Sequence, residues 1–405
     1  TPVLLGLFSL VTLIAQQLVT RQAMPVRCSA WYRKTHPTFS DALALVRRQF
    51  WVAELFSISR RSYAVADGSC TKAIMNRAKV DDETYINFLM ATPKVCSATE
   101  AARVQPEMAD PPAHDAFTRL LHRQEPDAAT LWREAAPQVE RQGGVLVVDD
   151  STLDKPYAKK IELAQRHWSG KHHAVVEGIN LITALWSDGD RHVPVDYRIY
   201  DKAGNALTKN DHFRTMLEAA HGRGFMPECV VFDSWYSSLD NLKQVRDLGW
   251  TWLTRLKANR LVNPDRTGLR PVASVETAAQ GKIVHLKGYG PIRLFLIVAP
   301  DGDKAYWATN DVNMTALTRV RFAGYSWTVE HYHRGIKQYC GVERAQVRAA
   351  RAQRNHIGLA LRAFLRLERH CYHVGISWFE AKTTIIRSAV QAYLTNPLYT
   401  LPATA

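Results

Sequence analysis

Acidic side chains follow two apolar, strand-like runs of the chain and recur in a later helical segment. Asp149 and Asp150 close the run GVLVVDD, Asp233 closes the run ECVVFD, and Glu330 lies in WTVEHYHRGIK. An ionised carboxylate beside a buried strand is costly unless a positive charge meets it. Mg²⁺ prefers oxygen ligands, and two such ions can activate an attacking oxygen and stabilise a leaving oxygen at a phosphodiester. The set predicts a divalent-metal site, although each aspartate alone is better explained as a turn or helix cap.

The glutamate has two cations beside it. On a helix, Glu330, Arg334 and Lys337 lie at positions i, i+4 and i+7 and share one face. One interpretation is an ion pair on a solvated helix face. The other is that Glu330 binds metal while Arg334 and Lys337 hold DNA phosphates. His331 and His333 flank the glutamate without forming an HExxH spacing, which excludes a zinc protease.

The order of the expected elements indicates an α/β fold with a mixed sheet. Short apolar runs rich in β-branched residues predict the strands, and capped amphipathic stretches predict the helices. The strands are expected at 144–150, 175–187, 192–201, 228–233 and 250–256, and the helices at 210–224 and 237–249. Asn210 or Asp211 is the expected cap of the first helix. Three strands, then helix, strand, helix and strand fit the ribonuclease H-like fold.

Further segments surround this core. We expect a ribonuclease H-like mixed sheet core with an inserted β subdomain, plus N-terminal and C-terminal helical regions. The expected boundaries are an apolar extension at 1–23, a helical DNA-binding domain at 24–140, the first part of the core at 144–258, the β-rich insertion at 259–312, the core helix carrying Glu330 at 313–340, and a basic helical region at 341–405.

The region before the core reads as short helices with tight breaks between them. Helices are expected at 38–60, 83–93 and 114–136. This spacing is typical of a helix-turn-helix DNA reader, in which Arg119 and Arg123 would face DNA. A helical packing domain with solvated basic residues explains the same pattern equally well.

The overall charge favours a polyanionic partner. The chain has 405 residues with 52 Lys+Arg and 38 Asp+Glu, a formal net charge of +14. Basic side chains that contact phosphates release condensed counterions, although a merely basic soluble protein remains open. Six scattered cysteines without a C-x-x-C pair predict reduced, mostly buried thiols in a reducing compartment. We expect a cytoplasmic protein, which a DNA partner would make nucleoid-associated. The apolar run 3–15 precedes the first methionine, Met24, and is too short for a comfortable membrane span, so we expect no membrane partner.

Three blocks of the sequence resemble the catalytic blocks of insertion-sequence DDE transposases. They are VVDDSTLDKPY, VVFDSWYSSLDNL and YSWTVEHYHRGIKQYCGVER, with 83 residues from Asp150 to Asp233 and 97 from there to Glu330. The resemblance covers about 144–370 and is greatest to the bacterial cut-and-paste branch with a β-rich insertion before the glutamate. That branch has a Tyr and an Arg where Ala323 and Ser326 stand here.

The resemblance implies roles for individual residues. Asp150, Asp233 and Glu330 would be the catalytic ligands of two Mg²⁺ ions, with Mn²⁺ as a substitute. Asp149 is the alternate to Asp150, which is preferred because it directly precedes two hydroxyl residues. Other residues are expected to contact DNA: Lys337, which matches the family's phosphate-binding lysine, and Arg334, Trp327, Trp235, Lys155 and Lys171.

The resemblance also implies an activity. We expect metal-dependent cleavage of DNA at the terminal inverted repeats of an element, followed by strand transfer into target DNA. A homodimer or larger oligomer on DNA is expected, because two ends must be cut together. Two alternatives remain open, namely a noncatalytic DNA-binding protein derived from a transposase and a simple Mg²⁺-dependent nuclease.

Overall fold

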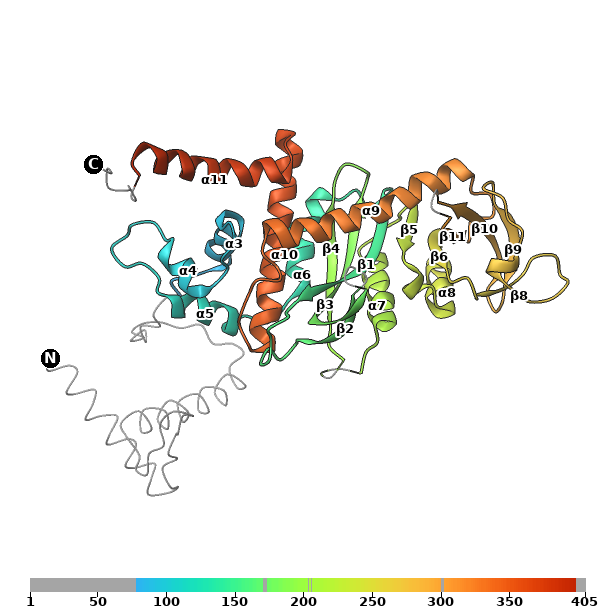
Figure 1. Cartoon of the computed structure of the whole chain (residues 1–405), viewed down its shortest axis with the longest axis horizontal. Coiled ribbons are helices and arrows are strands. Elements are labelled where there is room, and N and C mark those ends of the chain that lie inside the picture. The colour runs from blue at the N-terminus through green and yellow to red at the C-terminus, as the bar shows by residue number, and fades with distance from the viewer. Residues whose placement is uncertain (1–77, 170–172, 203, 205, 300–301, 398–405) are drawn as a thin grey trace, which may run out of the picture. The chain divides into compact units, whose positions relative to one another are not determined.

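The computed structural model describes residues 78–397 except 170–172, 203, 205 and 300–301 (Figure 1). The apolar extension 1–23, the helix expected at 38–60 and the first part of the expected DNA-binding domain lie outside the described residues.

Five strands form the centre of one mixed sheet. They are β1 (Val145–Asp154), β3 (Ala174–Ser187), β4 (Val193–Tyr200), β5 (Cys229–Phe232) and β6 (Trp252–Leu256). Their order in the sheet is β4-β3-β1-β5-β6, with β1, β3 and β4 antiparallel and β1, β5 and β6 parallel. This is the third-second-first-fourth-fifth order of the ribonuclease H-like fold, so the predicted fold class is confirmed.

Strand β1 is longer than its apolar run. It pairs with the parallel strand β5 only from Val145 to Val148, where both strands are buried. It pairs with the antiparallel strand β3 as far as Asp154, opposite Gly178. The prediction that β1 ends at Asp150 was therefore wrong. The second half of the strand is polar, and its hydrogen bonds to β3 keep it extended.

Two helices make the crossovers between the parallel strands. Helix α7 (Lys209–Gly222) joins β4 to β5, and helix α8 (Leu239–Asp247) joins β5 to β6. Thr208 caps α7, and its hydroxyl and the Asp211 carboxylate form a reciprocal capping box. The predicted cap, Asn210 or Asp211, was wrong by two or three positions, since Asp211 is the third helical residue of this box. Helix α7 contacts α8, β3 and β4, and α8 contacts β6; Figure 1 shows the two helices next to each other.

The strands expected in the insertion extend this sheet. Beyond β6 the order continues through β11 (Lys304–Thr309), β10 (Gly290–Val298), β9 (Lys282–Leu286), β7 (Leu261–Asn263) and β8 (Arg270–Pro271). Strand β11 pairs antiparallel with β6 and with β10. Strand β2 (Gln165–Ser169), which the sequence pattern did not predict, pairs with β3. The β-rich segment is thus continuous with the central sheet (Figure 1).

Helices pack on the sheet and on one another. They are α3 (Asp82–Ala91), α4 (Ala98–Arg103), α5 (His114–Arg123), α6 (Ala128–Ala135), α9 (Ala316–Tyr339), α10 (Ala350–Val374) and α11 (Trp378–Thr395). Helix α9 contacts β1 and β5, while α3, α5 and α6 contact α10. Arg362 of α10 pairs with Asp82 and Glu134, and Arg366 pairs with Glu83. Part of the positive charge of the C-terminal region is therefore neutralised by the helices before the core.

Two further expectations concern thiols and membranes. The described cysteines, Cys96, Cys229, Cys340 and Cys371, are buried and free, as predicted. Within the described residues, every helix is too short or too polar to cross a membrane.

Candidate active site

Asp149 and Asp150 face opposite sides of the sheet, because successive side chains alternate along a strand. The last parallel pair of β1 and β5 is Val148 with Phe232, so the next residues, Asp149 and Asp233, lie side by side at the end of β5. Helix α9 covers the Asp149 face, where His333 Nδ1 lies 4.0 Å from Asp149 Oδ2. Helix α7 covers the other face, where Lys209 bonds Asp150.

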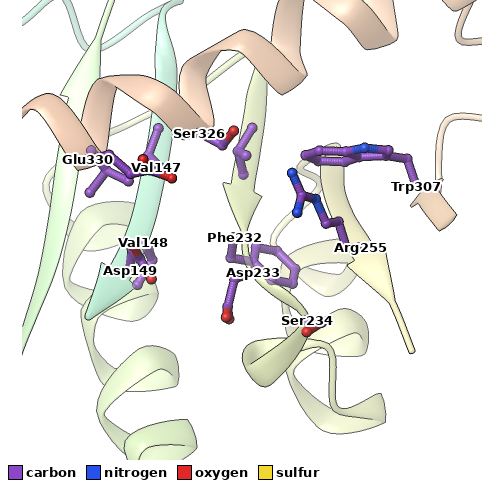
Figure 2. Close-up of a pocket in the computed structure, with 12 residues that line it drawn as sticks. Val147, Val148, Asp149, Phe232, Asp233, Ser234, Arg255, Trp307, Ser326 and Glu330 are labelled. Atoms are coloured by element: carbon purple, nitrogen blue, oxygen red, sulfur yellow. The ribbon is translucent and has the colours of Figure 1, made fainter. Parts of the chain in front are cut away.

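A pocket of about 170 Å³ lies on the Asp149 face. Asp149, Asp233 and Glu330 line it together with Arg255 and Trp307. Figure 2 shows these acidic side chains coming from three separate elements, β1, the end of β5 and α9. Asp150 is not among the lining residues. The structure thus brings Asp149 together with the other two predicted carboxylates, and directs Asp150 away from them.

The Asp149 carboxyl has no cationic partner among the residues that the structure describes. Burial raises the pKa of Asp149 well above its usual range, and the nearby carboxylates of Asp150, Asp233 and Glu330 raise it further. His333 does not offset this charge, because burial and the Lys337 cation lower the pKa of His333 to about 3, which keeps its ring neutral. A half-buried acid surrounded by other acids is a favourable place for a cation.

The donor set of the pocket suits a hard divalent cation, since all three candidate ligands are carboxylates. In the part of the chain that the structure describes, however, no three His, Cys, Asp or Glu side chains lie close enough to hold one ion together. The carboxylates therefore fit a metal in their chemistry and in their shared pocket, and holding a common ion requires them to draw closer.

Asp233 begins the turn that follows β5. Its carboxylate accepts a hydrogen bond of 2.9 Å from the backbone N–H of Trp235 and caps the 3₁₀ turn η2 (Ser234–Tyr236). The Thr254 hydroxyl donates to the Asp233 carbonyl from the neighbouring strand β6. Burial and the charge of Asp150 raise the pKa of Asp233 above its usual value. The aspartate is therefore both a turn cap and a lining residue of the pocket.

Asp150 is fully engaged on the opposite face. Its Oδ1 accepts a bond of 2.9 Å from the Tyr236 hydroxyl, and its Oδ2 accepts bonds of 2.7 Å from Asn180 and 2.8 Å from Lys209. Burial alone would raise the pKa of Asp150, but the Lys209 cation and these three donors outweigh burial and hold the pKa below its usual value. Asp150 is consequently an ionised, paired carboxylate.

Cations lie against aromatic rings in the pocket and at the turn after β5. The Arg255 guanidinium lies 4.9 Å from the centre of the Trp307 ring (Figure 2). The ring of Trp235, which is 58% exposed, has Lys209 Nζ at 5.5 Å and Lys257 Nζ at 5.9 Å. Sequence reasoning named Trp235 and missed the other four residues. An exposed arginine within the apolar strand run WTWLTRL was the available signal for Arg255.

The other residues expected on α9 have different surroundings. Trp327 is 62% exposed, and Glu330 and Arg334 are also exposed. Lys337 Nζ donates to the Thr152 carbonyl at 2.7 Å and lies 3.6 Å from a Glu343 carboxylate oxygen. Among the described residues, Glu330 forms no ion pair with Arg334 or Lys337, so the intrahelical ion pair is absent there.

The remaining predicted DNA contacts are largely occupied or lie elsewhere. Lys155 is 4% exposed and donates to the Glu343 and Ala345 carbonyls, which leaves it no free face for a phosphate. Arg119 pairs with Asp115, and Arg123 donates to the Val80 carbonyl. Lys171 lies outside the described residues.

A family model and a solved structure match the chain. Residues 84–290, just over half of the chain, match the family described as DDE superfamily endonuclease. The matched segment contains Asp149, Asp150 and Asp233 and ends before Glu330. A solved structure of the piggyBac transposase synaptic complex with hairpin DNA matches at a TM-score of 0.45 and 12% identity, over 88% of this chain and 83% of that chain. No curated protein sequence matches the chain. The chain belongs to the DDE superfamily endonuclease family.

Proposed function

We propose that this endonuclease is a DNA transposase, which cuts the ends of a mobile element and joins them to target DNA with the help of divalent cations. One observation carries the proposal: Asp149, Asp233 and Glu330 come from three separate elements and line one pocket. The family indicates the class of reaction, which is the cleavage of a nucleic acid strand at an internal position.

Three carboxylates would hold the metal. We assign Asp149 as the first ligand because it shares the pocket with Asp233 and Glu330, whereas Asp150 is paired on the opposite face. Mg²⁺ is the proposed ion, with Mn²⁺ as a substitute. Divalent cations bound there supply activation of a water oxygen and stabilisation of a leaving oxygen. The proposal requires Glu330 to approach the two aspartates on binding, since no three described acidic side chains are close enough to share an ion.

The cations and aromatic side chains around the pocket would hold DNA. Arg255 and Arg334 are exposed and would contact phosphates, and the exposed rings of Trp235 and Trp327 would stack on bases. In the first step the oxygen of water bonds to phosphorus and the bond to the 3′ oxygen breaks. In the second step that 3′ oxygen bonds to a phosphorus of target DNA, and the bond from this phosphorus to the 3′ oxygen of the target strand breaks. Coordinated cutting of two ends would need a homodimer or larger oligomer.

The test uses DNA that flanks the coding region. A fragment with a pre-cut, labelled 3′-OH end is incubated with a circular plasmid, Mg²⁺ and the full chain. We expect labelled DNA joined to the plasmid. The Glu330→Gln and Asp149→Asn variants should lose both cleavage and joining. Glu218→Gln, which changes an exposed carboxylate on α7, should behave as the unchanged chain does.

Two results would reject the transposase assignment. Hydrolysis of the labelled DNA without any joined product would indicate a simple metal-dependent nuclease. Specific DNA binding with cleavage that is equal in the unchanged chain and in Glu330→Gln would indicate that the pocket is not the catalytic centre.

A further inference from the structure

Asp150 connects β1, which carries Asp149, to the turn after β5, which carries Asp233, on the face of the sheet away from the pocket. Tyr236, which bonds Asp150 Oδ1 at 2.9 Å, lies three residues after Asp233 and ends the turn that Asp233 begins. Asp150 itself directly follows Asp149 on β1. The hydrogen bond from Tyr236 to Asp150, on the face of the sheet away from the pocket, therefore links two elements. One is β1 next to Asp149, and the other is the turn that begins at Asp233.

Two more partners complete this arrangement. Asn180 of β3 donates to Asp150 Oδ2 at 2.7 Å, and Lys209 at the start of α7 donates to the same oxygen at 2.8 Å. Asn180 is fully buried, and Tyr236 is fully buried as well. We call Asp150, Asn180, Lys209 and Tyr236 the Asp150 clasp. The clasp ties β1 to β3, to α7 and to the turn after β5.

We propose that the Asp150 clasp is a positioning device that fixes the separation and orientation of Asp149 and Asp233 for metal binding, and that Asp150 is not itself a metal ligand. The inference rests on the proposed function, because it requires Asp149 and Asp233 to bind a cation. Groups that orient metal ligands from behind typically change metal affinity or activity by roughly 10–100-fold when they are removed.

Three features favour a positioning role for Asp150. Both of its carboxylate oxygens already accept hydrogen bonds, which leaves few lone pairs for an ion. It points to the face of the sheet away from the pocket. Its charge is matched by the Lys209 ammonium, so it does not need a metal to neutralise it. The same ammonium lies 5.5 Å from the centre of the ring of Trp235, which directly follows the pocket residue Ser234.

The test measures Mn²⁺ binding to the full chain by titration calorimetry, together with thermal stability and the rate of DNA cleavage. Tyr236→Phe removes one hydroxyl from the clasp. Tyr289→Phe is the matched control, because the Tyr289 hydroxyl also forms a 2.9 Å hydrogen bond, with Trp252, away from Asp149 and Asp233. Asp149→Asn tests the proposed ligand, and Asp150→Asn tests the carboxylate of the clasp.

We expect Tyr236→Phe and Asp150→Asn to weaken Mn²⁺ binding by roughly 10–100-fold and to lower the cleavage rate, with an unchanged Kd for DNA. Tyr289→Phe should lose a similar amount of thermal stability while it keeps full Mn²⁺ affinity. Lys209→Arg, which retains the cation, should bind Mn²⁺ more tightly than Lys209→Met.

Three outcomes would overturn the inference, and they differ from one another. If Asp149→Asn loses Mn²⁺ binding while Tyr236→Phe binds as tightly as Tyr289→Phe, the clasp has no positioning role and the proposed function stands. If Asp150→Asn abolishes binding and Asp149→Asn keeps it, Asp150 is the ligand. If neither aspartate variant changes Mn²⁺ binding, both the proposed metal site and the positioning role of the clasp are rejected.

Discussion

The guanidinium of Arg255 lies 4.9 Å from the centre of the Trp307 ring, and the two residues are register partners on β6 and β11. Stacking of this kind stabilises a guanidinium in one orientation while its N–H groups remain free to bond. Because Arg255 lines the pocket together with Asp233, it is held where a phosphate next to the acidic residues would lie.

We therefore expect Arg255→Ala to weaken DNA binding at every salt concentration and to reduce the slope of log K against log salt by about one. Fluorescence anisotropy with a labelled duplex, at several salt concentrations, measures both quantities. The matched control is Arg246→Ala, since Arg246 also lies over an aromatic ring, that of Tyr289, at 5.2 Å. Equal slopes for the two variants would contradict a phosphate contact at Arg255.

A second prediction concerns metal addition and removal. A cation that binds only the folded chain should raise its thermal midpoint, and at 100 times its Kd it adds about 2.7 kcal/mol of stability. Differential scanning calorimetry with and without Mn²⁺ measures the shift, and a chelator should reverse it. Asp149→Asn should remove the shift, because it takes away a half-buried carboxylate whose pKa is raised by its acidic neighbours. A full shift retained in that variant would mean that the ion binds elsewhere.

The third prediction concerns acid stability and His356 of α10. This residue is buried, its Nδ1 lies 3.0 Å from the Tyr85 hydroxyl, and its Nε2 lies 3.2 Å from the Gly341 carbonyl. Burial lowers the pKa of His356 to about 4, so the ring is neutral in the folded chain. In the unfolded chain the ring takes up a proton near pH 6.5.

The sign of the pH effect follows from that difference. The unfolded chain binds the additional proton, so the stability contributed by neutral His356 is complete above pH 6.5 and is lost as the pH falls toward 4. Between pH 7 and pH 5 we expect the free energy of unfolding to fall by about 2 kcal/mol through this residue. Urea unfolding at both pH values should show a smaller loss for His356→Gln than for the unchanged chain. An equal loss in both proteins would exclude His356 as the cause.

The fourth prediction compares two glycines of α9. A Cβ atom at Gly335 would lie 2.7 Å from the Phe364 ring and 3.0 Å from the Trp378 ring, whereas one at Gly324 would meet no atom within 4 Å. Gly335→Ala should therefore destabilise the chain by about 1–3 kcal/mol through overpacking. Gly324→Ala should stabilise it by up to about 1 kcal/mol, because alanine favours the helix.

Denaturant unfolding of the two variants gives both changes in free energy. A stabilising effect of Gly335→Ala would show that α9 does not pack closely on α10 and α11. The pair is informative for the active site, since Glu330 lies on the same helix, between the two glycines.

The sequence predicted those parts of the fold that depend on local patterns. The run from Cys229 to Phe232 is apolar throughout, as a parallel strand buried on both faces requires, and its position was predicted closely. The expected β-rich segment also forms strands. The resemblance to DDE transposases is confirmed at the level of the DDE superfamily endonuclease family.

The sequence could not predict what depends on pairing between distant segments. The second half of β1 reads as polar, and only its pairing with β3 makes it a strand. The choice between Asp149 and Asp150 depends on a register of one residue against β5, which no local pattern contains. No local sequence pattern marks Lys209 or Tyr236 as partners of Asp150. Their contacts form only when α7 and the turn after β5 pack against the Asp150 side of β1.

The continuity of the sheet beyond β6 has a mechanical consequence. Strand β11 is hydrogen-bonded to β6 on one side and to β10 on the other, so a single strand separates the outlying hairpin from the strand that carries Arg255. Because β11 lies between β10 and β6 in the order of the described strands, a displacement of β9 or β10 would have to pass through β11 to reach Arg255 along the sheet.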